Sequence, residues 1–340
     1  MKIAVIALTR GGRELANRIV AGLENSESCA ITGGVLATIE QLWAHYDGLI
    51  CIMAAGIVVR AIAPLCRDKR IDPCVLVLDE KGQFVISLLS GHLGGGNELA
   101  RQVAAITGGA AVITTASDVT GHTALDLWAA GYNLRVQNPQ AMARVAARLV
   151  NEGEVGFYAG MACGRLPADF TVVTEPALAD IVLSYGAFDP SAHPDALVLC
   201  PCNLYLGLGC NRGTVAADFE LAVTDLCAQN RLDRRAIAGI ASIDLKADEA
   251  GLLQFARENN LPLCFYAAEE LNRVEGVSHS AAVMAATGAQ GVAEPAAILA
   301  AGDGIMPGQL IVRKIKWKDV TAAVAAKKLP DMVQTMVGKE

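Results

Sequence analysis

Short apolar runs alternate with amphipathic segments along the first third of the chain. The runs within 2–8, 48–53 and 74–78 are almost entirely apolar, which is typical of strands buried on both faces of a sheet. The expected order is strand 2–8, helix 13–23, strand 48–53, helix 58–65, strands 74–78 and 84–89, helix 98–106, strand 111–115 and helix 123–130. Such alternation predicts a largely parallel sheet with helices on both faces.

The same alternation returns in the last third, beyond a stretch of weaker periodicity. A strand enters the turn of 204–214, and further elements follow it. These are helix 215–228, strand 237–243, helix 250–259, strand 263–266, helices 280–287 and 295–301, and strands 310–315 and 320–325. We therefore predict an α/β fold with two Rossmann-like α/β domains, 1–133 and 203–340, joined by a smaller middle segment, 134–202.

Length and composition agree with this division. A chain of 340 residues exceeds the size at which one hydrophobic core keeps growing, so at least two domains are expected. Apolar residues make up 53% and charged residues 19%, which excludes a disordered chain. The net charge is −7 and no basic run interleaves with aromatic residues, so we expect no nucleic-acid partner.

The pattern predicts neither a membrane span nor a metal site. Every apolar stretch is interrupted before the roughly 18 to 20 residues that cross a bilayer, and the N-terminus is typical of a first strand, so a cytoplasmic location is expected. The ten cysteines are scattered through apolar segments. Their one cluster, Cys200, Cys202 and Cys210, lacks the CxxC spacing of a zinc site.

The octapeptide 90–97, SGHLGGGN, places His92 in a glycine-rich turn between an apolar run and a helix-like segment. Glycines let a backbone approach a ligand closely, and the N–H groups that begin a helix can bind an anionic oxygen. A histidine there can exchange a proton near neutral pH. The alternative is an ordinary strand-to-helix connection in which His92 caps a carbonyl.

Other turns help to decide whether 90–97 is a ligand-binding turn or an ordinary connection, because ligands of such sheets bind beyond the carboxyl ends of the strands. We expect three turns to converge there: 54–60, 90–97 and 114–118. Gly56 and Arg60 would offer a helix start and a cation, and Thr115 and Asp118 a hydroxyl and a carboxylate. The alternatives are a solvated helix charge for Arg60 and a helix N-cap for Asp118.

The turn of 206–214, LGLGCNRGT, superficially matches a dinucleotide-binding fingerprint. The pattern G-x-G-x-x-G would need glycine at Arg212, so no nucleotide cofactor is predicted. Cys210 is either a nucleophile or a small residue in a tight turn, and the lack of a nearby base favours the second. Arg212 and Thr214 are better suited to contact an anion.

Several strings carry a resemblance to a known family. They are AAGIVVRAIAP (54–64), KRIDPCVLVLDEKGQFVISLLSGHLGGGNELA (69–100), ITTASD (113–118), LGLGCNRGT (206–214), IASIDLKADEAGL (240–252), the segment 280–288 and VAEPAAILAAG (292–302). Together they resemble the CbiG-type family of anaerobic cobalamin biosynthesis, in that family's domain order and most weakly at 134–202. Gly96 and Ser117 replace the family's usual alanine and threonine without removing a needed functional group. The family's C-terminal domain is also found alone in the aerobic pathway.

The resemblance implies an enzyme that adds water to the δ-lactone of cobalt-precorrin-5A and expels acetaldehyde, leaving cobalt-precorrin-5B. Opening a lactone needs a base for water and donors for the oxyanion, and expelling acetaldehyde needs removal of a hydroxyl proton. We predict His92 as the base, with Glu98 or Asp118 orienting its imidazole. His122 is the reserve candidate and alternatively a structural cap.

The substrate-contacting residues are expected among the glycine turns and their neighbours. They are Gly56, Arg60, Ser90, Gly94, Gly95, Gly96, Asn97, Thr115, Arg212 and Thr214. The glycine N–H groups and Ser90 would serve an oxyanion or a carboxylate, and the arginines would anchor carboxylates of the corrinoid in a cleft between the two α/β domains.

Because cobalt arrives within the corrinoid substrate, no cofactor and no protein metal site are expected. A homodimer and transient contacts with neighbouring enzymes of the pathway are further expectations. Two other functions stay open: a non-catalytic corrinoid carrier in which His92 contacts cobalt, and a nucleotide-binding α/β regulator, which the missing fingerprint makes the weaker of the two.

Overall fold

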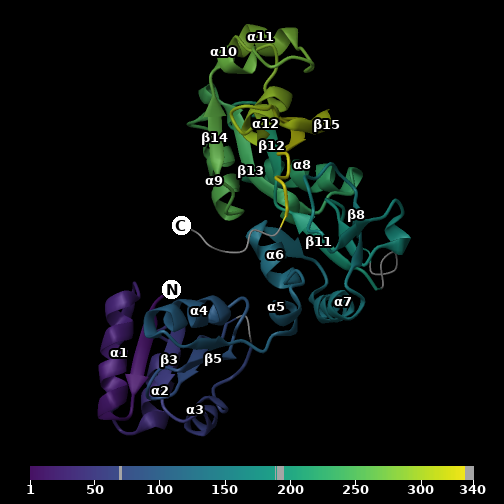
Figure 1. Ribbon diagram of the computed structural model, residues 1–340. Helices are drawn as coiled ribbons and strands as arrows, with labels where there is room; N and C mark the ends of the chain where they lie inside the picture. The colour runs from purple at the N-terminus through teal and green to yellow at the C-terminus, as the bar shows by residue number, and fades with distance from the viewer. Residues whose placement is uncertain (69–70, 188, 190–194, 334–340) are drawn as a thin grey trace. The chain divides into compact units, whose positions relative to one another are not determined.

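Three sheets build the chain in a computed structural model that describes residues 1–68, 71–187, 189 and 195–333 (Figure 1). The chain divides into two compact units, Met1–Leu127 and Trp128–Glu340. Helices and strands alternate through both units, which confirms the predicted α/β class. The domain boundaries at 133 and 202 stay a prediction, and Lys69 and Arg70, which open one family-like string, lie outside the described residues.

The first unit holds a six-stranded sheet in the order β2-β1-β3-β4-β5-β6. Its strands are β1 (Ile3–Ala7), β2 (Ser26–Ser28), β3 (Gly48–Ile52), β4 (Cys74–Leu78), β5 (Phe84–Leu89) and β6 (Ala110–Val112). Its larger helices are α1 (Arg10–Gly22), α2 (Val35–Trp43), α3 (Ala55–Ile62) and α4 (Gly96–Thr107). One face is covered by α1 and α4, through Ile19 and Val103, and the other by α2 and α3, through Ile39 and Val58.

The expected convergence of three turns on one edge of this sheet is wrong. β5 runs antiparallel to β4, and β6 runs parallel to β5, whereas β1, β3 and β4 run parallel to one another. The turns after β5 and β6 therefore lie at the opposite edge from the turn after β3, which carries Gly56 and Arg60 (Figure 1). The cause is a hairpin at 79–83, in which the Asp79 carboxylate accepts hydrogen bonds from the N–H groups of Lys81 and Phe84.

Two short helices follow β6 and close the candidate site. They are α5 (Ala116–Thr120) and α6 (Leu125–Gly131). The expected strand 111–115 ends instead at Val112, and α5 was not expected, because five residues are too few to show helical periodicity. Thr115 is the N-cap residue of α5, and Gly121 ends it in the left-handed conformation.

The second unit begins with a five-stranded sheet in the order β7-β11-β10-β8-β9. Its elements are β7 (Leu134–Val136), α7 (Pro139–Glu152), β8 (Val155–Ala159), β9 (Phe170–Val172), the 3-10 turn Pro176–Leu178, β10 (Ile181–Leu183) and β11 (Leu197–Pro201). An aromatic cluster of Trp128, Phe157 and Phe170 packs beside it, with the Trp128 and Phe170 ring centroids 4.9 Å apart. The Trp128 indole donates a hydrogen bond to the Met332 carbonyl at 2.8 Å, which ties the end of the described chain to this cluster.

The last sheet has the order β14-β13-β12-β16-β15. Its elements are β12 (Leu204–Cys210), α8 (Ala216–Gln229), β13 (Ile237–Ile243), α9 (Ala250–Glu258), β14 (Leu263–Tyr266), α10 (Ala268–Leu271), α11 (Ala281–Thr287), α12 (Ala293–Ala301), β15 (Gln309–Lys316) and β16 (Val320–Ala326), with 3-10 turns at Arg234–Ala236 and Asp244–Lys246. α8 and α9 pack together, and α12 packs directly on β12 and β16. Gly207 permits this approach, since a Cβ there would lie 1.8 Å from the Ala293 carbonyl oxygen.

Within the described ranges, no helix combines the length and the apolar character that crossing a lipid bilayer requires.

Candidate functional site

The glycine-rich turn leads from β5 directly into α4 and is closed by its own backbone. The N–H of Gly95 donates to the His92 carbonyl at 2.8 Å, that of Gly96 to the Ser90 carbonyl at 3.2 Å, and that of Asn97 to the Gly91 carbonyl at 2.8 Å. Two of the three glycine N–H groups expected to serve an oxyanion are thus already bonded within the turn. Gly94 is the one whose N–H makes none of these turn hydrogen bonds.

Ser90 lies at the base of this turn in an unfavourable conformation. Its φ is +52°, in the left-handed region that residues other than glycine seldom occupy. Its Oγ is buried and has no hydrogen-bond partner among the described residues. A Cβ on Gly94 would come within 2.6 Å of the Ser90 Cβ, so glycine is required where the turn folds back over the serine.

The His92 imidazole lies between two carboxylates. Its Nε2 is 2.9 Å from Asp118 Oδ2, at the start of α5, and its Nδ1 is 3.3 Å from Asp126 Oδ1, at the start of α6. All three side chains are between 14% and 18% exposed, so the group is largely shielded yet open to a ligand. Ionised carboxylates only accept hydrogen bonds, so this arrangement favours a ring that donates from both nitrogens, which is the imidazolium form.

The electrostatics agree with this geometry. The hydrogen bond to Asp126 raises the pKa of His92 above its ordinary value, and the Asp118 carboxylate adds to the shift, although burial opposes it. Burial also opposes ionisation of Asp118, but the Arg101 guanidinium and the His92 ring outweigh it and hold the pKa of this carboxyl below its usual range. Both shifts favour the ion pair.

Asp118 is held by groups on α4 as well as by His92. Arg101 Nη2 donates to Asp118 Oδ1 at 2.6 Å, and Asn97 Nδ2 donates to Asp118 Oδ2 at 2.9 Å and to Thr115 Oγ1 at 3.1 Å. Asn97 is only 5% exposed. The buried Asn97 side chain therefore links the turn after β5 to the turn after β6 by hydrogen bonds. A Cβ on Gly91 would lie 2.5 Å from Asn97 Oδ1, so no larger residue fits there without a shift.

The structure brings His92, Asp118, Asn97 and Thr115 together but leaves Glu98 aside. The Glu98 carboxylate faces Arg101 at 3.5 Å and Gln102 at 3.3 Å on the outer side of α4, and no contact with the imidazole is formed. Of the two carboxylates expected to orient His92, only Asp118 has the geometry for it.

The expected anchors for substrate carboxylates lie elsewhere. Arg60, at the other edge of the first sheet, donates to the Gly56 carbonyl at 3.0 Å. In the second unit Arg212 pairs with Asp248 and donates to the Leu245 carbonyl at 2.7 Å. Thr214 is 6% exposed, and its hydroxyl bonds to the Asn211 carbonyl at 2.9 Å. Each of these groups already has a partner, and their contact with a substrate stays a prediction.

Sequence reasoning missed Asp126 and Arg101. Arg101 follows Asn97 by four positions, which places both on one face of a helix, so the spacing could have suggested their common target. Asp126 had a weaker signal, as a carboxylate in the first turn of a short helix after the ITTASD string. The reserve candidate His122 lies between α5 and α6, where its backbone N–H donates to the Ser117 carbonyl at 3.1 Å and closes α5.

The cysteines of the cluster at 200, 202 and 210 carry free thiols that are buried or half-buried. Burial raises the pKa of the Cys210 thiol to about 11, so the thiol is neutral at ordinary pH. Cys200 is fully buried in the core of the last sheet. Among the side chains that the structure describes, no three His, Cys, Asp or Glu residues are grouped as metal ligands.

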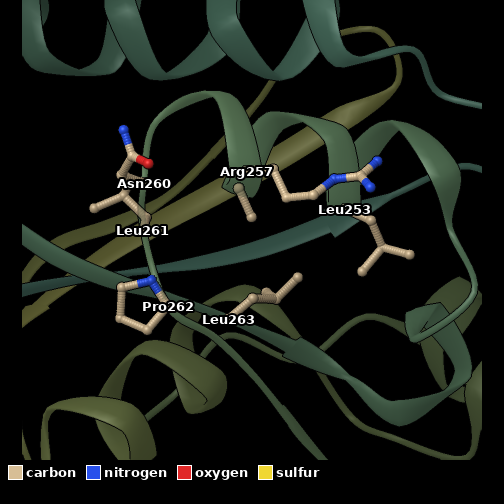
Figure 2. Close-up of a pocket in the computed structure, with 7 residues that line it drawn as sticks. Leu253, Arg257, Asn260, Leu261, Pro262 and Leu263 are labelled. Carbon is tan, nitrogen blue, oxygen red and sulfur yellow. The ribbon is translucent and has the colours of Figure 1, made fainter.

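A cavity of about 520 Å³ lies in the second unit, between α9 and β14 (Figure 2). Its lining consists of Leu253, Ala256, Arg257, Asn260, Leu261, Pro262 and Leu263. This wall is mainly apolar, with one guanidinium, and contains no group that titrates near neutral pH. It can shelter an apolar surface but cannot supply acid–base catalysis.

Comparison with known proteins identifies three family regions in succession. The region described as "Cobalamin synthesis G N-terminal" matches residues 37–118, "Cobalamin biosynthesis central region" matches 123–201, and "Cobalamin synthesis G C-terminus" matches 204–325. His92, Asp118 and Asp126 together form the His92 group. His92 and Asp118 lie in the first of these regions, and Asp126 lies in the second.

Two known proteins are similar to this chain over nearly its full length. The cobalt-precorrin-5A hydrolase of Priestia megaterium is 33% identical, covering 95% of this chain and 94% of that protein. The protein of the same name from Salmonella typhimurium is 36% identical, with 94% and 96% covered. A solved structure of a cobalamin biosynthesis protein G homolog from Sulfolobus solfataricus aligns with 96% of this chain and 97% of its own at 22% identity and a TM-score of 0.40.

Proposed function

Because the chain belongs to the cobalamin synthesis G family, we propose that it hydrolyses the δ-lactone of cobalt-precorrin-5A and releases acetaldehyde, leaving cobalt-precorrin-5B. The observation that carries the proposal is the similarity to two cobalt-precorrin-5A hydrolases over at least 94% of their lengths and of this chain. A non-catalytic carrier of the same corrinoid is not favoured, because these full-length relatives are named as enzymes.

His92 is the proton-transfer group of the proposed reaction. Water adds to the lactone carbonyl and loses a proton to solvent, and the ring oxygen that departs takes up a proton, which an imidazolium can supply. The imidazole left behind is then a base for the resulting hydroxyl group. When the hydroxyl proton is removed, the electrons of the O–H bond form the carbonyl of acetaldehyde. The C–C bond to the macrocycle breaks, and its electron pair enters the macrocycle. The charged resting state makes His92 an acid first and a base second, where residue type alone suggested a base throughout.

The reaction as written needs no resident cofactor, since cobalt enters within the substrate. Arg60 and Arg212 remain the proposed anchors for peripheral carboxylates, each by exchanging its present partner for a substrate group. A cytoplasmic location, a homodimer and transient contact with neighbouring enzymes of the pathway belong to the same proposal.

The test is release of acetaldehyde from cobalt-precorrin-5A by the purified protein without oxygen, with mass analysis of the corrinoid. We expect one acetaldehyde per substrate and the matching loss of mass. Replacing His92 by Ala should slow release by roughly a hundredfold or more, as for loss of a general acid–base group. Tight binding without release would instead favour the carrier, and an unchanged rate in folded His92→Ala would remove His92 from the mechanism.

A further inference from the structure

We propose that Asp126 is a positioning residue for His92: its carboxylate accepts a hydrogen bond from Nδ1–H while Asp118 accepts one from Nε2–H, so that the resting imidazole keeps both protons until substrate arrives. The inference rests on the proposed function for its catalytic meaning, but its structural content stands on the geometry of the His92 group alone.

The two carboxylates come from different helices and reach opposite sides of one ring. Asp118 belongs to α5 and Asp126 to α6, and the ring itself lies in the turn before α4. Among the described residues, the Ser117 hydroxyl lies 3.4 Å from Nε2, and Arg101 of α4 pairs with Asp118 and Glu98. A ring between two acceptors has one arrangement that satisfies both, the doubly protonated cation.

The two contacts differ in strength. Asp118 is 2.9 Å from the ring and is also held by Arg101 and Asn97, whereas the Asp126 contact is 3.3 Å long and its Oδ1 also accepts a hydrogen bond from the Leu127 N–H at 3.0 Å. Hydrogen bonds weaken as they lengthen, so a substrate oxygen can replace Asp126 at Nδ1 more readily than Asp118 at Nε2. Asp126 thus holds the resting ring, Asp118 keeps it oriented once substrate has bound, and Nδ1 is the nitrogen that delivers the proton.

The sign of the pH effect follows from this arrangement. A carboxylate next to a histidine raises its pKa, and Asp126 is the largest contributor to the upward shift at His92. Activity that needs the imidazolium is present below this pKa and is lost as the pH rises through it. Removing the Asp126 charge lowers the pKa, so the alkaline loss of activity should begin at a lower pH.

The experiment combines an NMR titration of the histidine side chains with a pH profile of acetaldehyde release. In Asp126→Asn we expect the His92 titration midpoint and the alkaline limb of kcat/KM to move down together, with about a tenfold or greater loss of rate on that limb. Asp126→Glu should restore part of the shift. Glu14→Gln on α1 is the control, because it removes the same charge from an exposed side chain of the same unit.

Each outcome bears on a different claim. If His92 titrates alike in wild type and Asp126→Asn, the positioning role is wrong, whether or not the protein makes acetaldehyde. Faster release by Asp126→Asn at neutral pH would also overturn it, because His92 would then act as a base from the start. If Asp126→Asn does not fold, the wild type decides: its His92 must titrate above the ordinary histidine value of about 6.5. Absence of acetaldehyde with a shifted His92 titration would refute the proposed function alone.

Discussion

Ser90 combines two unfavourable features in one residue. A left-handed backbone costs a residue with a Cβ about 1 kcal/mol or more, and a buried hydroxyl without a partner costs about 1 to 3 kcal/mol. Ser90 has both, with φ at +52° and an unbonded Oγ. It lies two positions before His92, and such concentrated strain is typical of sites whose geometry is maintained by the surrounding structure.

Ser90→Gly should therefore stabilise the protein by about 1 kcal/mol, after allowing for the greater freedom of glycine in the unfolded chain. Ser90→Ala is the matched control, because it removes the hydroxyl and keeps the backbone strain. Urea denaturation measures both variants. A Gly variant less stable than the Ala variant would show that the left-handed conformation is not a source of strain.

At the scale of elements, the hairpin between β4 and β5 decides where the chemistry lies. Parallel neighbours need a crossover of a dozen or more residues, and only residues 79–83 separate these two strands. The reversal was therefore foreseeable from strand spacing. Alternation of strands and helices predicts one strand direction throughout, and the short separation of β4 and β5 overrides that prediction. The sequence correctly predicted that the turns carrying His92 and Asp118 lie close together. It did not predict that the turn carrying Arg60 lies at the opposite end of the sheet.

The buried carboxylate of Glu294 holds the start of α12 against its neighbours. Its side chain, at the start of α12, accepts hydrogen bonds from the Ser278 N–H at 2.6 Å, the Ser278 hydroxyl at 3.0 Å and the Lys314 N–H at 2.9 Å. It is 2% exposed. Burial opposes its ionisation, but these donors hold its pKa below the usual glutamate value. The carboxylate thus joins α12, β15 and the segment before α11.

Glu294→Gln should lower the free energy of unfolding by about 3 kcal/mol, because an amide brings its own donors against two backbone N–H groups. The folded-state pKa is depressed, so the contribution of Glu294 is complete above its unfolded pKa of about 4.3 and is lost as the pH falls below that value. Unfolding at pH 7 and at pH 3 measures this. An equal difference between wild type and variant at both pH values would contradict the assignment.

At the scale of the whole molecule, the acid–base group belongs to one compact unit. His92, Asp118 and Asp126 all lie within Met1–Leu127. The core of the last sheet, in which Leu206, Phe219 and Phe255 are almost completely buried, lies mainly within residues 204–326 and takes Cys200 and Tyr185 from the preceding segment. The sequence resemblance implies that this domain also occurs alone. Folding of the last part of the chain therefore need not depend on the unit that carries the histidine.

A chain of residues 203–340 should unfold cooperatively on heating and release no acetaldehyde from cobalt-precorrin-5A. Cooperative unfolding follows from a core that lies mainly within this segment, and the missing activity follows from the absence of His92, Asp118 and Asp126. Circular dichroism and the acetaldehyde assay measure the two properties. Broad, non-cooperative melting would show that this core is incomplete, and acetaldehyde release would move the catalytic group out of the first unit.

The sequence by itself determined the α/β class, most of the longer helices and strands of the first and last sheets, and the turn that carries His92, because these depend on the spacing of apolar residues and glycines over a few positions. It also carried the family resemblance. Tertiary structure decided which turns meet, through the antiparallel pairing of β5. It also decided the charge of His92, through carboxylates 26 and 34 positions away along the chain. Strand direction and long-range contacts depend on how elements pack, and local periodicity carries no record of that packing.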